Sequence, residues 1–256
     1  MKYESAKIII ISGANGGIGL EIAKAFLREN SIVILPVHIK AGNIQKLLDI
    51  YGENRVHVMQ LDQRDLTSID SFIETVDNQF GRVNVLVNNA GIVRLTSLAD
   101  MSENVWNDTL ETNVKGPFLL SQKVLPLMKK AGGGSIVNIS SISGHEPTPG
   151  LGAYSTSKAG MIMLTRQMAI EWAPYNIRVN AVSPGLIRTP LTEDLYKNEQ
   201  IHQRRRELIP LKQIGTGEQI ADIVCFLCSS KSSYITGQSI VADGGLMGSV
   251  QAHIPR

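Results

Sequence analysis

The sequence predicts an α/β fold of the doubly wound type, in which a parallel sheet carries helices on both faces. Two observations predict it. Short, continuously apolar runs recur along the chain, as expected for strands that are buried on both faces of a parallel sheet. Stretches with helical periodicity separate these runs, so strand and helix alternate. The apolar runs occupy residues 7–12, 31–37, 55–62, 82–91, 134–143, 177–185 and 238–245.

Composition limits the class of protein further. The 256 residues are 43% apolar and 19% charged, which suits one globular domain, and we expect a single domain over 1–256. The net charge of +2 argues against nucleic acid or an anionic membrane as a partner. No apolar run approaches the ~20 residues of a membrane span, and residues 1–12 lack a signal-peptide cleavage site. We therefore expect a cytoplasmic protein.

The first apolar run leads into the glycine-rich stretch SGANGGIG at 12–19. The next residues have helical periodicity, with Ile22, Phe26 and Leu27 on one face. A glycine loop before a helix lets backbone N–H groups approach a phosphate, which the helix dipole also favours. The spacing G-x-x-x-G-x-G departs from the usual G-x-G-x-x-G, and a tight turn alone also needs glycine. The position after the first strand nevertheless favours a nucleotide site.

Two further features lie at predicted strand ends. Asp62 follows the third run, where its carboxylate can accept a hydrogen bond from an adenine amino group. The residues Asn89, Ala90 and Gly91 end the fourth run. If the first strand lies beside the fourth, this turn and the glycine loop flank one crevice, where ligands of open α/β sheets bind. Taken alone, the turn is also typical of any strand end.

The stretch after the fifth run carries candidate acid–base chemistry. Tyr154 and Lys158 are four residues apart, so they share one face of a helix. A free tyrosine has a pKa of ~10, and we expect the neighbouring ammonium to lower it, which would make a general acid/base. Ser141 lies near the end of the fifth strand and can hydrogen-bond a carbonyl or alkoxide. A hydrolase is not supported, because a G-x-S-x-G elbow and a suitably placed histidine are missing.

The segment at about 186–214 breaks the alternation with polar, helix-like sequence, and we expect an amphipathic lid. Its arginine run 204–206, beside Glu207, is typical of a solvated helical face. The spacing of Cys225 and Cys228 would suit metal or redox chemistry, but no further ligands accompany them, so no metal site is expected. Buried, inert thiols in a reducing compartment fit better.

Together, the glycine loop, the turn 88–91, Ser141 and the Tyr154–Lys158 pair resemble the short-chain dehydrogenase/reductase family. The resemblance is to its one-domain branch, which includes 3-oxoacyl-(acyl-carrier-protein) reductases and related alcohol dehydrogenases, and it extends from Lys7 to about Gly245. It implies a Rossmann fold with a seven-stranded parallel sheet. It also implies a homo-tetramer or a dimer, for which the apolar stretches 116–128 and 159–170 are candidate helix interfaces.

The resemblance also implies roles for individual residues. Asn113 would complete a catalytic tetrad with Ser141, Tyr154 and Lys158, and would support a water that links Lys158 to solvent. Ser12 stands where the family usually has threonine, and keeps the hydroxyl. The residues implied to hold the cofactor are Ser12, Gly13, Asn15, Gly16, Gly17, Ile18, Gly19, Val37, His38, Asp62, Asn89, Ala90, Gly91, Tyr154, Lys158, Pro184, Gly185, Ile187 and Thr189.

The implied function is an NAD(P)-dependent oxidoreductase that moves a hydride between the nicotinamide and a ketone or secondary alcohol. Tyr154 would exchange the proton, Ser141 would polarise the oxygen, and Lys158 with the oxidised nicotinamide would lower the tyrosine pKa. A 3-oxoacyl-thioester reductase is one specific form of this activity. The alternatives are a non-catalytic nucleotide-sensing protein, which the intact tetrad disfavours, and an epimerase, whose family members are usually longer.

The choice between NAD and NADP rests on the end of the second strand. Family members that use NAD usually carry an acidic residue there, whereas this chain has Val37. His38 and Lys40 could partly neutralise a 2′-phosphate, so the sequence leans towards NADP. The substrate itself is open. Residues 92–98, 144–152 and 186–210 would line it, and His145 and Glu146 could face either a polar substrate or solvent.

Overall fold

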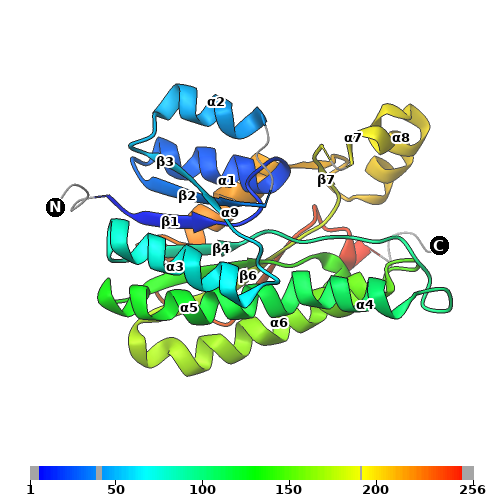
Figure 1. Ribbon diagram of the computed structural model, residues 1–256. Helices are drawn as coiled ribbons and strands as arrows, with labels where there is room; N and C mark the ends of the chain where they lie inside the picture. The colour runs from blue at the N-terminus through cyan, green and yellow to red at the C-terminus, as the bar shows by residue number, and fades with distance from the viewer. Residues whose placement is uncertain (1–5, 39–41, 191, 250–256) are drawn as a thin grey trace.

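The computed structural model describes residues 6–38, 42–190 and 192–249. Within them, a seven-stranded sheet of order β3-β2-β1-β4-β5-β6-β9 runs through the middle of the molecule (Figure 1), and its strands pair in parallel. This confirms the predicted doubly wound fold, and each strand lies within the apolar run that predicted it. The strands are β1 (Ile8–Ile11), β2 (Ile32–Val37), β3 (Val56–Gln60), β4 (Val85–Asn88), β5 (Gly134–Ile139), β6 (Ile177–Pro184) and β9 (Ser239–Ala242).

Helices cover both faces of this sheet (Figure 1). One face carries α1 (Gly17–Arg28), α2 (Gly42–Tyr51) and α9 (Gly217–Leu227). The other carries α3 (Leu66–Phe80), α5 (Gly116–Lys130) and α6 (Gly152–Trp172). A shorter helix, α4 (Glu103–Leu110), continues into α5 through one turn of π-helix at Glu111–Lys115.

Strand β1 explains why the sheet-forming runs are continuously apolar. Successive side chains of a strand point to opposite faces. Ile9 and Ile11 belong to the core under α1 and α9, whereas Ile8 and Ile10 belong to the core under α3 and α5. All four are fully buried, and each contributes about 1.5–3 kcal/mol relative to an exposed side chain.

The order of the strands fixes where a ligand can bind. Strand β1 pairs with β2 on one side, with Ile10 opposite Ile34, and with β4 on the other, with Ile10 opposite Leu86. The direction of sheet growth therefore reverses between β1 and β4, which opens a crevice at their carboxyl ends. The first and fourth strands therefore lie side by side, as the predicted crevice between the glycine loop and the turn 89–91 requires.

The segment after β6 stands beyond the carboxyl edge of the sheet (Figure 1). It contains α7 (Glu193–Lys197) and α8 (Glu199–Leu208), as its polar, helix-like sequence predicted. Two very short strands, β7 (Ile187–Arg188) and β8 (Gly215–Thr216), pair in parallel and join its two ends, a feature that the sequence did not predict.

Two further expectations concern membranes and cysteines. Across the described ranges, no helix combines the length and the apolar character that crossing a bilayer requires. Cys228 on the end of α9 is buried and Cys225 is partly buried, and burial raises the pKa of each thiol to about 12. The predicted burial is confirmed for Cys228, whereas Cys225 is only partly buried.

Candidate active site

The glycine loop connects β1 to α1 at the reversal point of the sheet. Gly13 (φ 70°) and Gly17 (φ 56°) adopt left-handed conformations that favour glycine. A Cβ atom on Gly19 would lie 2.5 Å from the carbonyl oxygen of Gly13, so the first turn of α1 packs directly against the loop. The loop thus exposes backbone rather than side chains at a helix N-terminus, where an anion is favoured.

Ser12 joins this loop to the turn after β4. Its Oγ accepts hydrogen bonds from the backbone N–H groups of Asn89 (3.1 Å) and Ala90 (3.0 Å). In return, the side-chain Nδ2 of Asn89 donates to the backbone carbonyl oxygens of Ser12 and Gly13, each at 3.0 Å. The hydroxyl that the sequence assigned to cofactor binding is therefore engaged in holding the two walls of the crevice in register.

A cavity of about 630 Å³ occupies the crevice. It brings together the glycine loop, the turn after β4, the end of β5 and the start of α6. Most of the residues predicted for the site share it. Asn113 and Gly19 do not line it, and Ser12, Val37, His38 and Asp62 line a neighbouring cleft instead. The predicted residues in its wall are Gly13, Asn15, Gly16, Gly17, Ile18, Asn89, Ala90, Gly91, Ser141, Tyr154, Lys158, Pro184, Gly185, Ile187 and Thr189.

Tyr154 and Ser141 form the centre of this wall. Burial raises the pKa of the Tyr154 phenol, and a hydrogen bond with the Ser141 side chain lowers it in part. The neighbouring Ser140 does not compete for this role, because its hydroxyl donates to the carbonyl oxygen of Lys158 at 2.9 Å.

Lys158 corrects one electrostatic expectation. Its Nζ lies 5.5 Å from the centroid of the Tyr154 ring and donates a 2.8 Å hydrogen bond to the carbonyl oxygen of Ile139. Burial lowers the pKa of this lysine to about 8. The predicted lowering of the Tyr154 pKa by Lys158 is wrong for the protein alone: burial raises this pKa, and the group that counteracts burial is Ser141 rather than Lys158.

Asn113 lies in the π-helical turn between α4 and α5, a local geometry that is frequent at functional sites. Its side chain accepts from the N–H of Ile92 at 2.8 Å and donates to the carbonyl oxygen of Ile92 at 2.9 Å and to the Ser157 hydroxyl at 3.0 Å. The side chain is only 1% exposed. It therefore fixes the loop after β4, which is part of the cavity wall, from behind.

A second cleft of about 480 Å³ adjoins the first and contains Val37, His38 and Asp62. Arg64, which the sequence analysis did not single out, binds the Asp62 carboxylate through Nε (3.1 Å) and Nη2 (2.9 Å). This pairing lowers the pKa of Asp62, so the carboxylate keeps its charge. Lys40, the other predicted cation here, lies outside the described residues.

His145 and Glu146 have different surroundings in the structure. The Nε2 atom of His145 lies 3.1 Å from the hydroxyls of both Ser183 and Ser239, at the junction of β6 and β9. Glu146 is exposed. Neither residue lines the main cavity, and His145 links β6 to β9 at the edge of the sheet.

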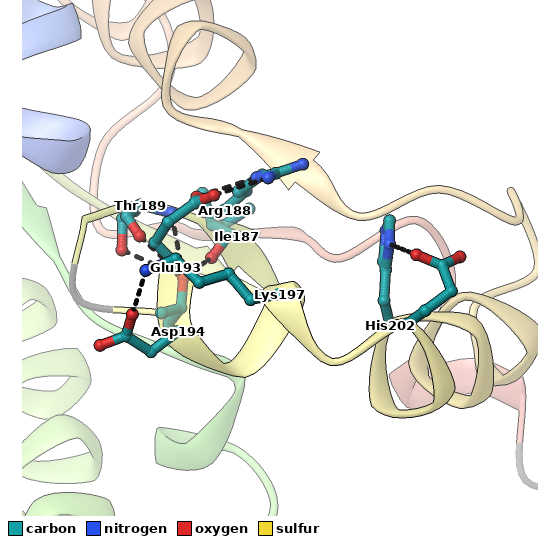
Figure 2. Close-up of polar contacts among 9 residues, drawn as sticks. Ile187, Arg188, Thr189, Glu193, Asp194, Lys197 and His202 are labelled. Atoms are coloured by element: carbon teal, nitrogen blue, oxygen red, sulfur yellow. Dashed lines mark hydrogen bonds and ion pairs between the residues drawn. The ribbon is translucent and has the colours of Figure 1, made fainter.

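The segment between β7 and β8 closes the far side of the cavity. Thr192 Oγ1 donates to the carbonyl oxygen of Ile187 at 2.8 Å and accepts from the Thr189 N–H at 2.9 Å, which keeps the predicted Thr189 against the cavity (Figure 2). Tyr196 and Arg205 complete this wall. The sequence placed the whole arginine run on a solvated face, which holds for Arg204 but not for Arg205.

A dinucleotide fits this arrangement. The two cavities share wall residues at Gly13, Asn15 and Gly91, so they form one continuous trough. Glycines line the part of the trough where the backbone would contact a pyrophosphate, so no side chain blocks that contact. This part of the trough adjoins the N-terminus of α1. The fold and the trough define a dinucleotide-dependent oxidoreductase.

Comparisons with known proteins make the family specific. The family model described as enoyl-(acyl carrier protein) reductase matches residues 13–247. A 3-oxoacyl-(acyl-carrier-protein) reductase FabG of Thermotoga maritima is 41% identical over 94% of this chain and 98% of its own length. The human dehydrogenase/reductase SDR family member 4 is 35% identical over 93% of this chain and 87% of its own length.

Solved structures agree with these relatives. A candidate short-chain alcohol dehydrogenase from Sinorhizobium meliloti 1021 superposes with a TM-score of 0.89 at 33% identity, over 96% of this chain and 98% of its own. The chain belongs to the short-chain dehydrogenase/reductase family, whose members use NAD(P).

Proposed function

We propose that this chain is an NAD(P)-dependent oxidoreductase of ketones or secondary alcohols, with Tyr154 as general acid/base. The observation that carries the proposal is that Tyr154, Ser141 and Lys158 line one cavity with the glycine loop. We propose the whole chain, 1–256, as one cofactor-binding domain, with 186–214 as its substrate segment. Free thiols at Cys225 and Cys228 suit a reducing, cytoplasmic setting.

Each residue of the proposed centre has a distinct task. NAD(P), when bound, supplies or accepts the hydride at the substrate carbon. In the reductive direction Tyr154 donates its phenolic proton to the carbonyl oxygen, and in the oxidative direction it takes that proton back. Ser141 donates a hydrogen bond to the same oxygen. Asn113 is a positioning residue, because it acts through Ile92 and Ser157.

The residues for the cofactor follow from the trough. We propose that the glycine loop and Ile18 hold the pyrophosphate, that Asn89–Gly91 and Lys158 hold the nicotinamide ribose, and that Thr189 holds the carboxamide. The adjoining cleft with Asp62 would take the adenine. The lean towards NADP is supported by Val37, which offers the ribose no carboxylate, and by His38 and Arg64 in the same cleft.

A narrower proposal is that the substrate is a 3-oxoacyl thioester. It is favoured by the relatives at 41% and 38% identity that are described as 3-oxoacyl-(acyl-carrier-protein) reductases. The cavity extends beyond Tyr154 to Tyr196 and Arg205, which leaves room for a substituent on the reacting carbonyl.

Assembly is a separate proposal. Met163 and Ile170 on the outer face of α6 are 59% and 76% exposed, which is high for large apolar side chains on a monomer surface. We propose a homo-tetramer in which this helix meets another copy. Sedimentation that shows only monomer at micromolar concentration would contradict it.

The test is a turnover assay with NADH and NADPH against a panel of ketones, secondary alcohols and 3-oxoacyl thioesters. Net change in cofactor absorbance is the expected result. Tight cofactor binding with no turnover on any member would instead favour a nucleotide sensor. Conversion of a chiral alcohol to its epimer without net cofactor change would favour an epimerase.

A further inference from the structure

Helix α8 turns one arginine of the run 204–206 into the cavity. His202 and Arg205 are three residues apart and are only partly exposed, and the buried Ile209 follows four residues later, so the three lie on one face. Arg204 and Arg206, on either side, are exposed. Arg205 therefore lines the same cavity as Tyr154 and Ser141.

The side chain of Tyr196 orients this guanidinium. The Arg205 Cζ atom lies 5.6 Å from the centroid of the Tyr196 ring, and Nη1 donates to the Tyr196 hydroxyl at 3.4 Å. Tyr196 is 4% exposed, so it is a fixed support. A guanidinium has five N–H donors, and within the described chain this is the hydrogen bond that Arg205 makes. Its remaining donors are available to a ligand.

The two acidic side chains of α7 are paired elsewhere. Glu193 binds Arg188 at 2.6 Å and Asp194 binds Lys197 at 2.7 Å, on the side of α7 that Figure 2 displays. Among the described residues, those that line the cavity include no aspartate or glutamate. The positive charge of Arg205 is therefore not neutralised by an acidic group in the cavity wall.

A partly buried cation without a counter-charge is costly unless a ligand supplies one. The planar fork of arginine matches the two oxygens of a carboxylate or phosphate. The second cation of the cavity, Lys158, already donates to Ile139. An incoming anion at the outer end of the cavity would therefore meet Arg205.

We propose that Arg205 binds an anionic group of the substrate, and that the substrate class is a ketone or alcohol carrying a carboxylate or phosphate away from the reacting carbon. The inference rests on the proposed function. Two sources share this chemistry: the carboxylate of a free oxo acid, and the phosphate of a phosphopantetheine arm in a thioester.

The test compares matched substrates in the full-length enzyme. One pair is a short 3-oxo acid and its methyl ester, and the other is a 3-oxoacyl pantetheine thioester with and without its 4′-phosphate. We expect Arg205→Met to lower kcat/KM about 10- to 100-fold for the anionic member of one pair and hardly at all for the neutral member. The pair that responds identifies the source of the anion.

Two further variants sharpen the test. Arg205→Lys retains the positive charge without the planar guanidinium, and should keep part of the preference for the anionic substrate. Arg204→Met removes an exposed arginine one residue away and should change neither member of either pair. The proposal would be overturned if Arg205→Met left the ratio of kcat/KM for the anionic over the neutral member unchanged, that is, if kcat/KM fell equally for both members or for neither. A raised KM for NADPH with an unchanged ratio would overturn it too, and would assign Arg205 to the cofactor pyrophosphate.

A binding measurement separates this inference from the proposed function. Calorimetric titration of the oxo acid and of the phosphorylated thioester into the enzyme with NADP⁺ needs no turnover. Anion binding that Arg205→Met abolishes would support Arg205 even if no tested ketone reacts. If the wild type turns over neutral ketones but binds neither anion, the proposed function stands and the role of Arg205 falls.

Discussion

The Nζ atom of Lys158 donates a 2.8 Å hydrogen bond to the carbonyl oxygen of Ile139, and its side chain is almost fully buried. A charged lysine is thus held in the interior at the end of β5, with its pKa lowered to about 8. Proteins commonly carry such unfavourable groups where chemistry requires them.

The first prediction concerns stability. The folded-state pKa of Lys158, about 8, lies below its ordinary value of 10.5, so the unfolded chain binds more protons between these values. The free energy of unfolding should therefore rise with pH across this window, by up to about 3 kcal/mol from this group. In Lys158→Met this part of the rise should be missing in urea denaturation at pH 7–10.5. Lys231→Met, at an exposed lysine, should retain it.

The second prediction concerns the proton donor. Tyr154→Phe removes the phenolic proton and keeps the ring that packs in the cavity wall. We expect kcat to fall by about 10²- to 10⁴-fold, while the dissociation constant of the cofactor changes little. Tyr175→Phe is the matched control at an exposed tyrosine. Turnover retained by Tyr154→Phe would remove Tyr154 from the mechanism.

The third prediction concerns pH dependence. Alcohol oxidation needs the phenolate of Tyr154, whose pKa is raised by burial, so the oxidation rate should increase with pH through the alkaline range. Carbonyl reduction needs the phenol and should decline over the same range. In the free enzyme the hydrogen bond from Ser141 lowers this pKa, so Ser141→Ala should move both kcat/KM profiles to higher pH, whereas Ser141→Thr should not. Profiles that stay in place would show that Ser141 does not act on Tyr154.

The fourth prediction concerns the hydroxyl of Ser12. Ser12→Ala leaves two N–H groups, of Asn89 and Ala90, without their acceptor. We expect a loss of about 2–4 kcal/mol in the free energy of unfolding and a weaker affinity for the cofactor. Ser12→Thr keeps the hydroxyl and should resemble the wild type. Equal stability of the alanine variant and the wild type would contradict this account.

The fifth prediction concerns the choice of cofactor. Val37 ends β2 and lines the cleft that also contains Asp62, the proposed adenine site. A carboxylate at this position would bind the ribose hydroxyls and repel a 2′-phosphate. Val37→Asp should therefore lower the ratio of kcat/KM for NADPH over NADH by about 10- to 100-fold, and the neutral Val37→Asn should lower it much less. An equal effect of both variants would show that charge at this position does not select the cofactor.

The strands of the sheet could be predicted because their signal is local. A parallel strand covered on both faces must be apolar throughout, as in β1, and few other segments meet that requirement. The strands β7 and β8 have two residues each, too few to carry a pattern. They form because the segment between them returns to its starting point.

The site was predictable where residue types and spacing carry the chemistry, as for Tyr154 and Lys158. It was not predictable where the outcome depends on packing between distant elements. The pKa of Tyr154 depends on its burial, and the direction of Arg205 depends on the support from Tyr196. The contact of Arg64 with Asp62 could not be predicted, because it forms only when the turn after β3 is folded.

The pairing of β7 with β8 brings the two ends of the 26-residue excursion from 189 to 214 together, with Ile187 opposite Gly215 and Arg188 opposite Thr216. Insertions or replacements between these points need not disturb the strands on which Ser141 and the glycine loop depend. Chimaeras of related enzymes could therefore be made by exchanging this excursion alone. Such an exchange would replace the proposed substrate segment, and with it Thr189 of the proposed cofactor site, while Ser141, Tyr154 and Lys158 would stay in place.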